Sequence, residues 1–173
     1  MLQKLRQSKR EEGFTIIEVL IVLAIAGLIL LIVFLAVPAL QRNSRNTQRK
    51  DDASAILSGL SEYVGNNSGT LPTACSGSST TVTWGATGTA QNDTKMGYYN
   101  GGCVTSSPTN GKVYLNTTSG TVAALSSSTQ DYIEVVTGDV CSGNGAAAGS
   151  ARQTAILYEI ETSGGYTGQC EQS

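Results

Sequence analysis

A polar N-terminal segment is followed by one long apolar run in this chain of 173 residues. Residues 19–40 read VLIVLAIAGLILLIVFLAVPAL, without a charged or polar side chain. At about 1.5 Å per residue the run predicts a helix of roughly 33 Å, enough to cross a hydrocarbon core of about 30 Å. A buried core helix would need a far larger protein around it, because the run is apolar on every face. A cleavable secretory signal has a shorter apolar region, of about 7–15 residues.

The helix is predicted to continue into a polar segment that carries one apolar stripe. Residues 41–64 contain no proline, and their apolar side chains recur at helical spacing. The stripe consists of Ala53, Ile56, Leu57, Leu60 and Val64. We expect it to pack against a globular domain. We expect the helix to end at Gly65-Asn66-Asn67, because Gly and Asn tolerate the left-handed conformation of a helix cap.

The rest of the chain predicts an α+β head. Residues 65–111 are mostly Gly, Ser, Thr and Asn, which favours a long surface loop with short strands at most. Trp84 in this loop either contacts an external surface or glycan, or anchors the loop through a small satellite cluster. Four strand-like segments follow, and we expect them to form an antiparallel sheet against the helix, the first two as a hairpin. They are residues 113–115, 121–125, 132–136 and 154–161.

Charge is divided unevenly along a chain whose net charge is −2. Residues 1–50 carry eight basic and three acidic side chains, whereas residues 51–173 carry three basic and ten acidic ones. The acidic part offers no basic surface for a nucleic-acid backbone, so no specific nucleic-acid binding is expected. Four basic side chains after the apolar run either contact anionic lipid and acidic neighbours or form a solvated, self-paired helix surface. They are Arg42, Arg45, Arg49 and Lys50.

The residue types of the chain do not indicate an enzyme. The chain has no histidine, which excludes Ser-His-Asp and Cys-His catalysis and His-bearing zinc sites. Carboxylates in the C-terminal part are scattered, and strand alternation would turn Glu134, Glu159 and Glu161 outward. We therefore expect no enzyme, no metal site and no cofactor.

All four cysteines, Cys75, Cys103, Cys141 and Cys170, follow the apolar run. Their even number and wide spacing, without a CxxC motif, indicate two disulfides in an exported domain. Free structural thiols in a cytosolic domain are the alternative. Basic residues flank the apolar run on both sides, so the positive-inside rule prefers neither orientation. The cysteines therefore place the N-terminus in the cytoplasm and the residues beyond about 45 outside.

One carboxylate, that of Glu18, lies just inside the apolar stretch, one helical turn beyond Phe14. An unpaired carboxylate in lipid costs a few kcal/mol, so such a residue is a functional candidate. The alternative is a side chain at the membrane edge that reaches for water.

The segment from Lys9 to Gly27, KREEGFTIIEVLIVLAIAG, resembles the class III signal of bacterial type IV pilins and of the related pseudopilins. It combines a short charged leader, a terminal Gly13, the aromatic Phe14, Glu18 four residues further on, and then an apolar helix. The rest of the chain resembles the family in layout alone, with a long helix, a Gly/Ser/Thr-rich loop, a few strands and a C-terminal cysteine pair.

The resemblance implies a role for each of these residues. A prepilin peptidase would cut between Gly13 and Phe14, and the new amino group of Phe14 would be methylated. Glu18 would then pair with the Phe14 ammonium of a neighbouring subunit, which lowers the cost of placing two charges in apolar surroundings. Gly27 and Pro38 would bend the helix, with Pro38 about one turn later than in the family.

Four parts follow from this resemblance. They are a leader peptide (1–13), a transmembrane and assembly helix (14–40), its amphipathic continuation (41–64) and the globular head of a pilin ladle (65–173). Four cysteines allow three pairings, and we expect Cys75–Cys103 and Cys141–Cys170, the second as the cysteine loop of many pilins. Residues 141–170 would then be a candidate surface for adhesion on a filament.

The implied function is that of a structural subunit of a type IV pilus, polymerised through its hydrophobic helix for adhesion, motility or DNA uptake. Its partners would be copies of itself, other pilins, prepilin peptidase and the assembly machinery in the cytoplasmic membrane. The precursor would be a single-pass membrane protein with its N-terminus inside, and the assembled subunit would be extracellular. A pseudopilin of a secretion or competence system and a plain membrane-anchored binding protein are the alternatives.

Overall fold

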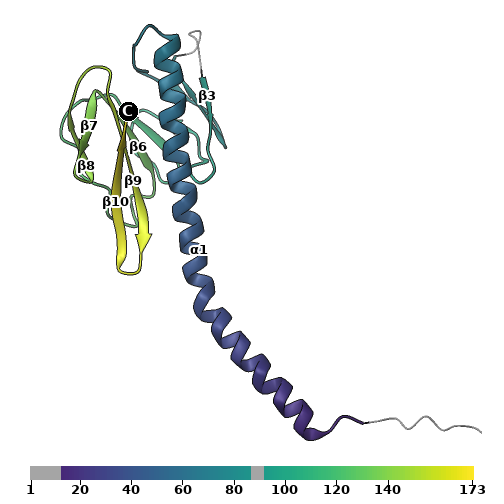
Figure 1. Ribbon diagram of the computed structural model, residues 1–173. Helices are drawn as coiled ribbons and strands as arrows, with labels where there is room; N and C mark the ends of the chain where they lie inside the picture. The colour runs from purple at the N-terminus through teal and green to yellow at the C-terminus, as the bar shows by residue number, and fades with distance from the viewer. Residues whose placement is uncertain (1–12, 87–91) are drawn as a thin grey trace, which may run out of the picture. The chain divides into compact units, whose positions relative to one another are not determined.

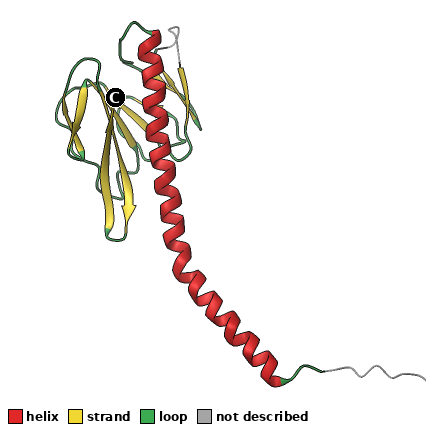
Figure 2. Ribbon diagram, viewed as in Figure 1, coloured by secondary structure: helices red, strands yellow, loops and turns green. Residues whose placement is uncertain are grey.

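The computed structural model describes residues 13–86 and 92–173. These residues form one helix and three β-sheets, so the fold is α+β, as expected (Figures 1 and 2). The chain divides into two compact units, residues 1–40 and 41–173, and each is described by itself. The expected leader lies outside the described residues except for Gly13.

The first unit consists of the N-terminal part of helix α1. The whole helix spans Ile16–Asn66 and continues through Pro38 without interruption. Every residue from 13 to 41 is exposed, which leaves the apolar side chains of this segment without partners inside the described chain. By length and composition α1 is able to cross a membrane, as the apolar run predicts.

The second unit begins with the C-terminal part of α1, which buries one face against the strands. Ala53, Ile56 and Leu60 of the predicted stripe are buried, and Leu57 is partly buried. Tyr63 is buried instead of Val64, because it lies one helical turn beyond Leu60 on the same face.

Five strands form the central sheet, which is mixed. The order is β10-β9-β6-β5-β4, and β5 pairs parallel with both β4 and β6, whereas β9 pairs antiparallel with β6 and β10. The expectation of a wholly antiparallel sheet is therefore wrong. The strands are β4 (Cys103–Val104), β5 (Val113–Asn116), β6 (Ile133–Thr137), β9 (Thr154–Thr162) and β10 (Gly165–Gln172).

The predicted hairpin after β5 does not form. Residues 121–125 are not a strand, and Val122 makes only an isolated bridge with Ala146. Residues 117–132 return to the end of the sheet at which β5 begins, and β6 therefore runs parallel to β5. Leu125 is buried in a cluster with Leu157 and Val136, so the apolar residues of this segment serve packing rather than a ladder.

Two smaller sheets complete the head. Strands β1 (Cys75–Ser76), β2 (Thr81–Trp84) and β3 (Asn92–Lys95) form an antiparallel sheet within the segment predicted as a loop. Strands β7 (Asp139–Ser142) and β8 (Gly145–Ala148) form a hairpin. Trp84 is fully buried in the main core, where its Nε1 donates to Thr94 Oγ1 at 2.9 Å. Trp84 therefore neither faces outward nor belongs to a satellite cluster.

The central sheet is covered on both faces. Ile156 and Tyr158 of β9 belong to the core against α1, whereas Ala155 and Leu157 belong to the second cluster. A strand buried on both faces has no side that faces solvent. The expectation that Glu134 and Glu159 point outward is therefore wrong. Glu134 is 5 % exposed and Glu159 is fully buried.

The left-handed residues that cap α1 follow the predicted Gly65-Asn66-Asn67 instead of lying within it. Ser68 (φ 57°) and Gly69 (φ 82°) adopt the left-handed conformation, whereas Gly65 does not. The Gly69 N–H donates to the Val64 carbonyl at 2.8 Å, which is the six-to-one bond of a Schellman motif. Helix α1 thus ends at Asn66, within the predicted range.

Candidate functional site

The predicted processing segment lies immediately before α1. Gly13, Phe14 and Thr15 are not helical, and the Phe14 side chain is 88 % exposed. A Cβ atom added to Gly13 would meet no atom within 4 Å, so nothing in the described chain covers the peptide bond between Gly13 and Phe14. With respect to the described residues, the bond expected to be cut is therefore accessible.

Glu18 closes a capping box with Thr15. One carboxylate oxygen, Oε2, accepts hydrogen bonds from the Thr15 backbone N–H at 2.8 Å and from the Thr15 hydroxyl at 2.6 Å. The Glu18 N–H in turn donates to Thr15 Oγ1 at 3.4 Å. The sequence Thr15-Ile16-Ile17-Glu18 has the T-x-x-E spacing of this motif, a signal that sequence reasoning missed.

The structure brings together the three N-terminal candidates, Gly13, Phe14 and Glu18. Together with Thr15, they line one open pocket with a volume of about 400 Å³. Phe14 and Glu18 also line an adjacent apolar hollow. The Glu18 carboxylate thus lies at the positive end of the helix dipole, beside the residue that would become the new N-terminus.

Gly27 and Pro38 lie further along α1, apart from this cluster. Both are exposed, and a Cβ atom at Gly27 would meet nothing within 4 Å. Proline lacks the N–H that would bond to the carbonyl four residues earlier, so Pro38 removes one rung of the helix ladder. A bend at these two residues remains a prediction.

Both disulfides are the pairs expected from the sequence. Cys75–Cys103 joins β1 to β4 and thereby ties the three-stranded sheet to the central sheet. Cys141–Cys170 joins β7 to β10 and ties the β7–β8 hairpin to the edge of the central sheet. Each bridge therefore links two sheets rather than two strands of one sheet.

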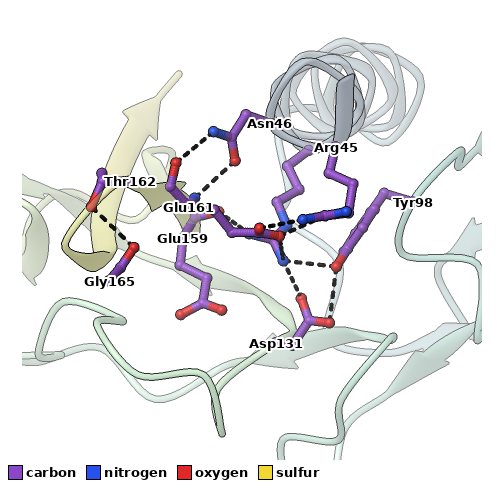
Figure 3. Close-up of polar contacts among 9 residues, drawn as sticks. Arg45, Asn46, Tyr98, Asp131, Glu159, Glu161, Thr162 and Gly165 are labelled. Atoms are coloured by element: carbon purple, nitrogen blue, oxygen red, sulfur yellow. Dashed lines mark hydrogen bonds and ion pairs between the residues drawn. The ribbon is translucent and has the colours of Figure 1, made fainter. Parts of the chain in front are cut away.

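A polar cluster fixes the C-terminal part of α1 to the head (Figure 3). Arg45 binds the Glu161 carboxylate through two bonds of 2.8 and 2.5 Å. Asn46 exchanges two hydrogen bonds of 2.8 Å with the backbone of Glu161, as a neighbouring strand would. Arg49, which is 2 % exposed, donates to Tyr98 Oη at 2.7 Å and to Asp131 at 3.0 Å.

This cluster corrects both interpretations of the basic residues after the apolar run for two of the four, Arg45 and Arg49. Arg45 and Arg49 are paired, but with the head rather than with acids on their own helix. One turn further on, Asp52 accepts three backbone N–H groups, from residues 97, 98 and 99, at 2.6–2.8 Å. Sequence spacing carried no signal of these contacts, because their partners are between 45 and 116 residues away.

Burial and pairing shift the pKa values of the carboxylates in this region. Hydrogen bonding to Arg45 lowers the pKa of Glu161. Burial raises the pKa of Glu159 to about 7, and both of its carboxylate oxygens lack a hydrogen-bond partner in the described part of the chain. Burial also raises the pKa of Glu134, which accepts a hydrogen bond from Asn116 at 2.8 Å.

Within the described residues, no group of three or more Asp, Glu, Cys or His side chains is arranged to hold a metal ion.

The comparison with protein families matches residues 8–34 to the prokaryotic N-terminal methylation motif. The match covers the processing segment and residues 19–34 of the apolar run. Comparisons with curated proteins and with solved structures gave no match.

Proposed function

We propose, from the N-terminal methylation motif at residues 8–34 and its resemblance to the class III signal of type IV pilins and pseudopilins, that the chain is a structural subunit of a type IV pilus. Prepilin peptidase cuts between Gly13 and Phe14, and the amino group of Phe14 is methylated. The mature subunit leaves the cytoplasmic membrane and polymerises with copies of itself through residues 14–40 into an extracellular fibre.

One observation carries this proposal: the methylation motif runs directly into an apolar helix surface that nothing in the described chain covers. Exposed apolar area costs about 25 cal/mol per Å² in water, so residues 14–40 need another environment. Lipid supplies it for the precursor, and neighbouring helices supply it in a filament. A domain held on a plain anchor would need only the first of these environments.

The capping box gives the assembly role of Glu18 a physical basis. In the isolated chain the Glu18 carboxylate caps its own helix through Oε2 alone. Cleavage creates a cationic amine at Phe14, and a neighbour's carboxylate neutralises this charge at low cost because both groups lie at the apolar surface. Pairing is therefore available only after the leader has been removed.

The mass and N-terminal sequence of the protein isolated from its native membrane test the processing step. We expect a chain that begins at N-methyl-Phe14 and lacks residues 1–13. A chain that begins at Met1 would contradict the proposal and leave an ordinary signal anchor.

Shear fractionation and electron microscopy test the polymerisation step. We expect the mature chain in the sheared fraction, in fibres longer than the cell envelope is thick. A mature chain that stays with the cells as short assemblies would assign it to the pseudopilins, which share the same signal.

A further inference from the structure

Two adjoining cavities open beside the C-terminal end of α1 and share Leu71 and Arg152. The larger, of about 490 Å³, is walled by residues 68–73, Thr117, residues 137–138 and Ala151. The smaller, of about 260 Å³, has Leu60, Val64 and Thr154 in its wall. The larger volume lies in the range of about 300–1,000 Å³ that is typical of small-molecule sites. We call the two cavities together the Arg152 groove.

Arg152 supplies the positive charge of the groove. Among the described residues its guanidinium has no ion pair or hydrogen bond, whereas Arg45 and Arg49 are both engaged with acids. Three guanidinium atoms would lie 3.4–3.5 Å from a Cβ atom on Gly69, so the planar group packs against this glycine. The helix cap holds Gly69 with φ 82°, and the cation is thereby positioned without its charge being used.

Hydroxyl groups without partners line the rest of the groove. Thr137 is 9 % exposed, and its hydroxyl has no hydrogen bond within the described chain. Thr154 is fully buried in the smaller cavity, and its Oγ1 likewise has no partner there. Thr73 and Thr117 add two exposed hydroxyls, which are also unbonded among the described residues. A buried hydroxyl without a partner is unfavourable, and a ligand with polar groups would supply the missing hydrogen bond.

We propose that the Arg152 groove binds a monosaccharide unit that bears one carboxylate, such as a uronic or sialic acid. The guanidinium binds the carboxylate through two parallel hydrogen bonds. The threonine hydroxyls both donate and accept, which suits the hydroxyl groups of a sugar. Leu71 and the side chains of Leu60 and Val64 provide an apolar floor for the faces of the sugar ring.

The charge of the head favours a monoanion over a phosphate. Residues 51–173 carry ten acidic side chains and three basic ones, and the three bases are Lys95, Lys112 and Arg152. A single carboxylate is neutralised by Arg152, whereas a phosphate monoester leaves a second negative charge in an acidic field. A polyanion such as a nucleic acid would meet the same repulsion over a larger area.

Binding measurements with the mature full-length chain in detergent micelles test this site. The probes are methyl β-D-glucuronide and its neutral match, methyl β-D-glucoside, which differs only at the carboxylate. We expect saturable binding of the glucuronide by calorimetry and by saturation-transfer NMR, and at least about tenfold weaker binding of the glucoside. Glucose 6-phosphate should bind more weakly than the glucuronide.

Matched variants locate the binding. Arg152→Gln should weaken glucuronide binding by about tenfold or more, whereas Lys112→Gln, which removes another base of the head, should leave it within about twofold. Thr117→Val removes an exposed hydroxyl and should weaken binding while the thermal midpoint stays unchanged. Thr117→Val therefore decides the question if Arg152→Gln lowers the stability of the head.

Three results would overturn the proposal. They are an absence of saturable binding to both the glucuronide and a sialic acid glycoside, equal binding of the glucoside, and unchanged binding in both Arg152→Gln and Thr117→Val. Tighter binding of glucose 6-phosphate, or of a short oligonucleotide, would also reject a carboxylate site. The fate of the leader and the length of the filament do not affect any of these results.

Discussion

Glu18 caps its own helix through Thr15, and in the proposed filament it also pairs with the Phe14 amine of a neighbouring subunit. Each contact uses a different property of the side chain. The capping box uses a hydrogen-bond acceptor, which Gln also provides. Pairing with a cationic amine at Phe14 uses the negative charge, which Gln lacks. Substitutions at Glu18 and Thr15 therefore separate the two roles.

We expect Glu18→Gln and Glu18→Ala to insert into the membrane and to be cleaved normally, but to give strongly reduced filament yields. Thr15→Ala weakens the cap by about 1 kcal/mol and keeps the charge, so its yield should stay closer to that of the native chain. Quantitative blots of sheared fractions, normalised to mature chain in the membrane, measure this. A normal yield from Glu18→Gln would remove charge pairing as the assembly role.

Glu159 makes the stability of the head depend on pH. Burial raises its pKa from 4.5 to about 7, while Arg49 opposes this shift and Asp131 and Glu161 add to it. Below pH 4.5 the group is protonated in both the folded and the unfolded state. Between pH 4.5 and 7 the unfolded chain loses the proton first, so the free energy of unfolding decreases by at most about 3 kcal/mol over this window.

Glu159→Gln removes the titration and keeps the volume of the side chain. We expect this variant to be more stable than the native chain at pH 8, with the difference vanishing near pH 4. Urea unfolding followed by tryptophan fluorescence reports it, because Trp84 lies in the core. A difference that is the same at both pH values would show that Glu159 does not titrate in this range.

At the scale of elements, a glycine sets how closely α1 approaches the three-stranded sheet. A Cβ atom at Gly59 would overlap the Thr94 side chain and come within 3.2 Å of Trp84 Nε1. These two groups are joined by the hydrogen bond that satisfies the buried indole N–H. The contact between helix and sheet therefore depends on the absence of a side chain at this position.

We expect Gly59→Ala to destabilise the head by about 1–3 kcal/mol, because overpacking would push Thr94 and Trp84 apart. Gly65→Ala is the matched control: the site is helical, and an added Cβ would meet nothing within 4 Å. Because Ala favours a helix more than Gly by up to about 1 kcal/mol, the control should be neutral or stabilising. Equal effects of the two changes on the unfolding midpoint would contradict this account.

At the scale of the whole molecule, the proposed removal of the leader would change the charge of the chain. Residues 1–13 contain four basic and two acidic side chains, so removal of this leader leaves seven basic and eleven acidic ones. The net charge would change from −2 to −4. The four basic side chains of the leader would be replaced by a single amine at Phe14, close to Glu18.

The two disulfides hold the sheets of the head together, and their removal is a further test. Cys141→Ala with Cys170→Ala opens a link across 29 residues, which the loop-entropy model values at about 3–4 kcal/mol. We expect a loss of this size in the free energy of unfolding. A reducing agent should lower the stability of the native chain by more than it lowers that of the variant, because the native chain has two disulfides to lose and the variant has one. Peptide mapping without reduction should recover Cys75 with Cys103, and a peptide that joins Cys75 to Cys170 would contradict the pairing.

Local patterns determined much of this protein. The apolar run, the stripe from Ala53 to Leu60 and the end of the helix near Asn66 follow from spacing and composition, because a helix repeats every few residues. The N-terminal candidates Gly13, Phe14 and Glu18 also lie together, because they are neighbours in sequence. The α+β class followed from one long helix and later strand-like segments.

Only the tertiary structure decided the long-range features. Strand β5 pairs parallel with β6, and Arg49 contacts Asp131, which is far from it in sequence. Glu134 and Glu159 are buried because distant parts of the chain cover them. No local period encodes such pairings, since they depend on which surfaces the packed chain covers. The Arg152 groove has the same origin, because the helix cap and the start of β9 meet only in the folded head.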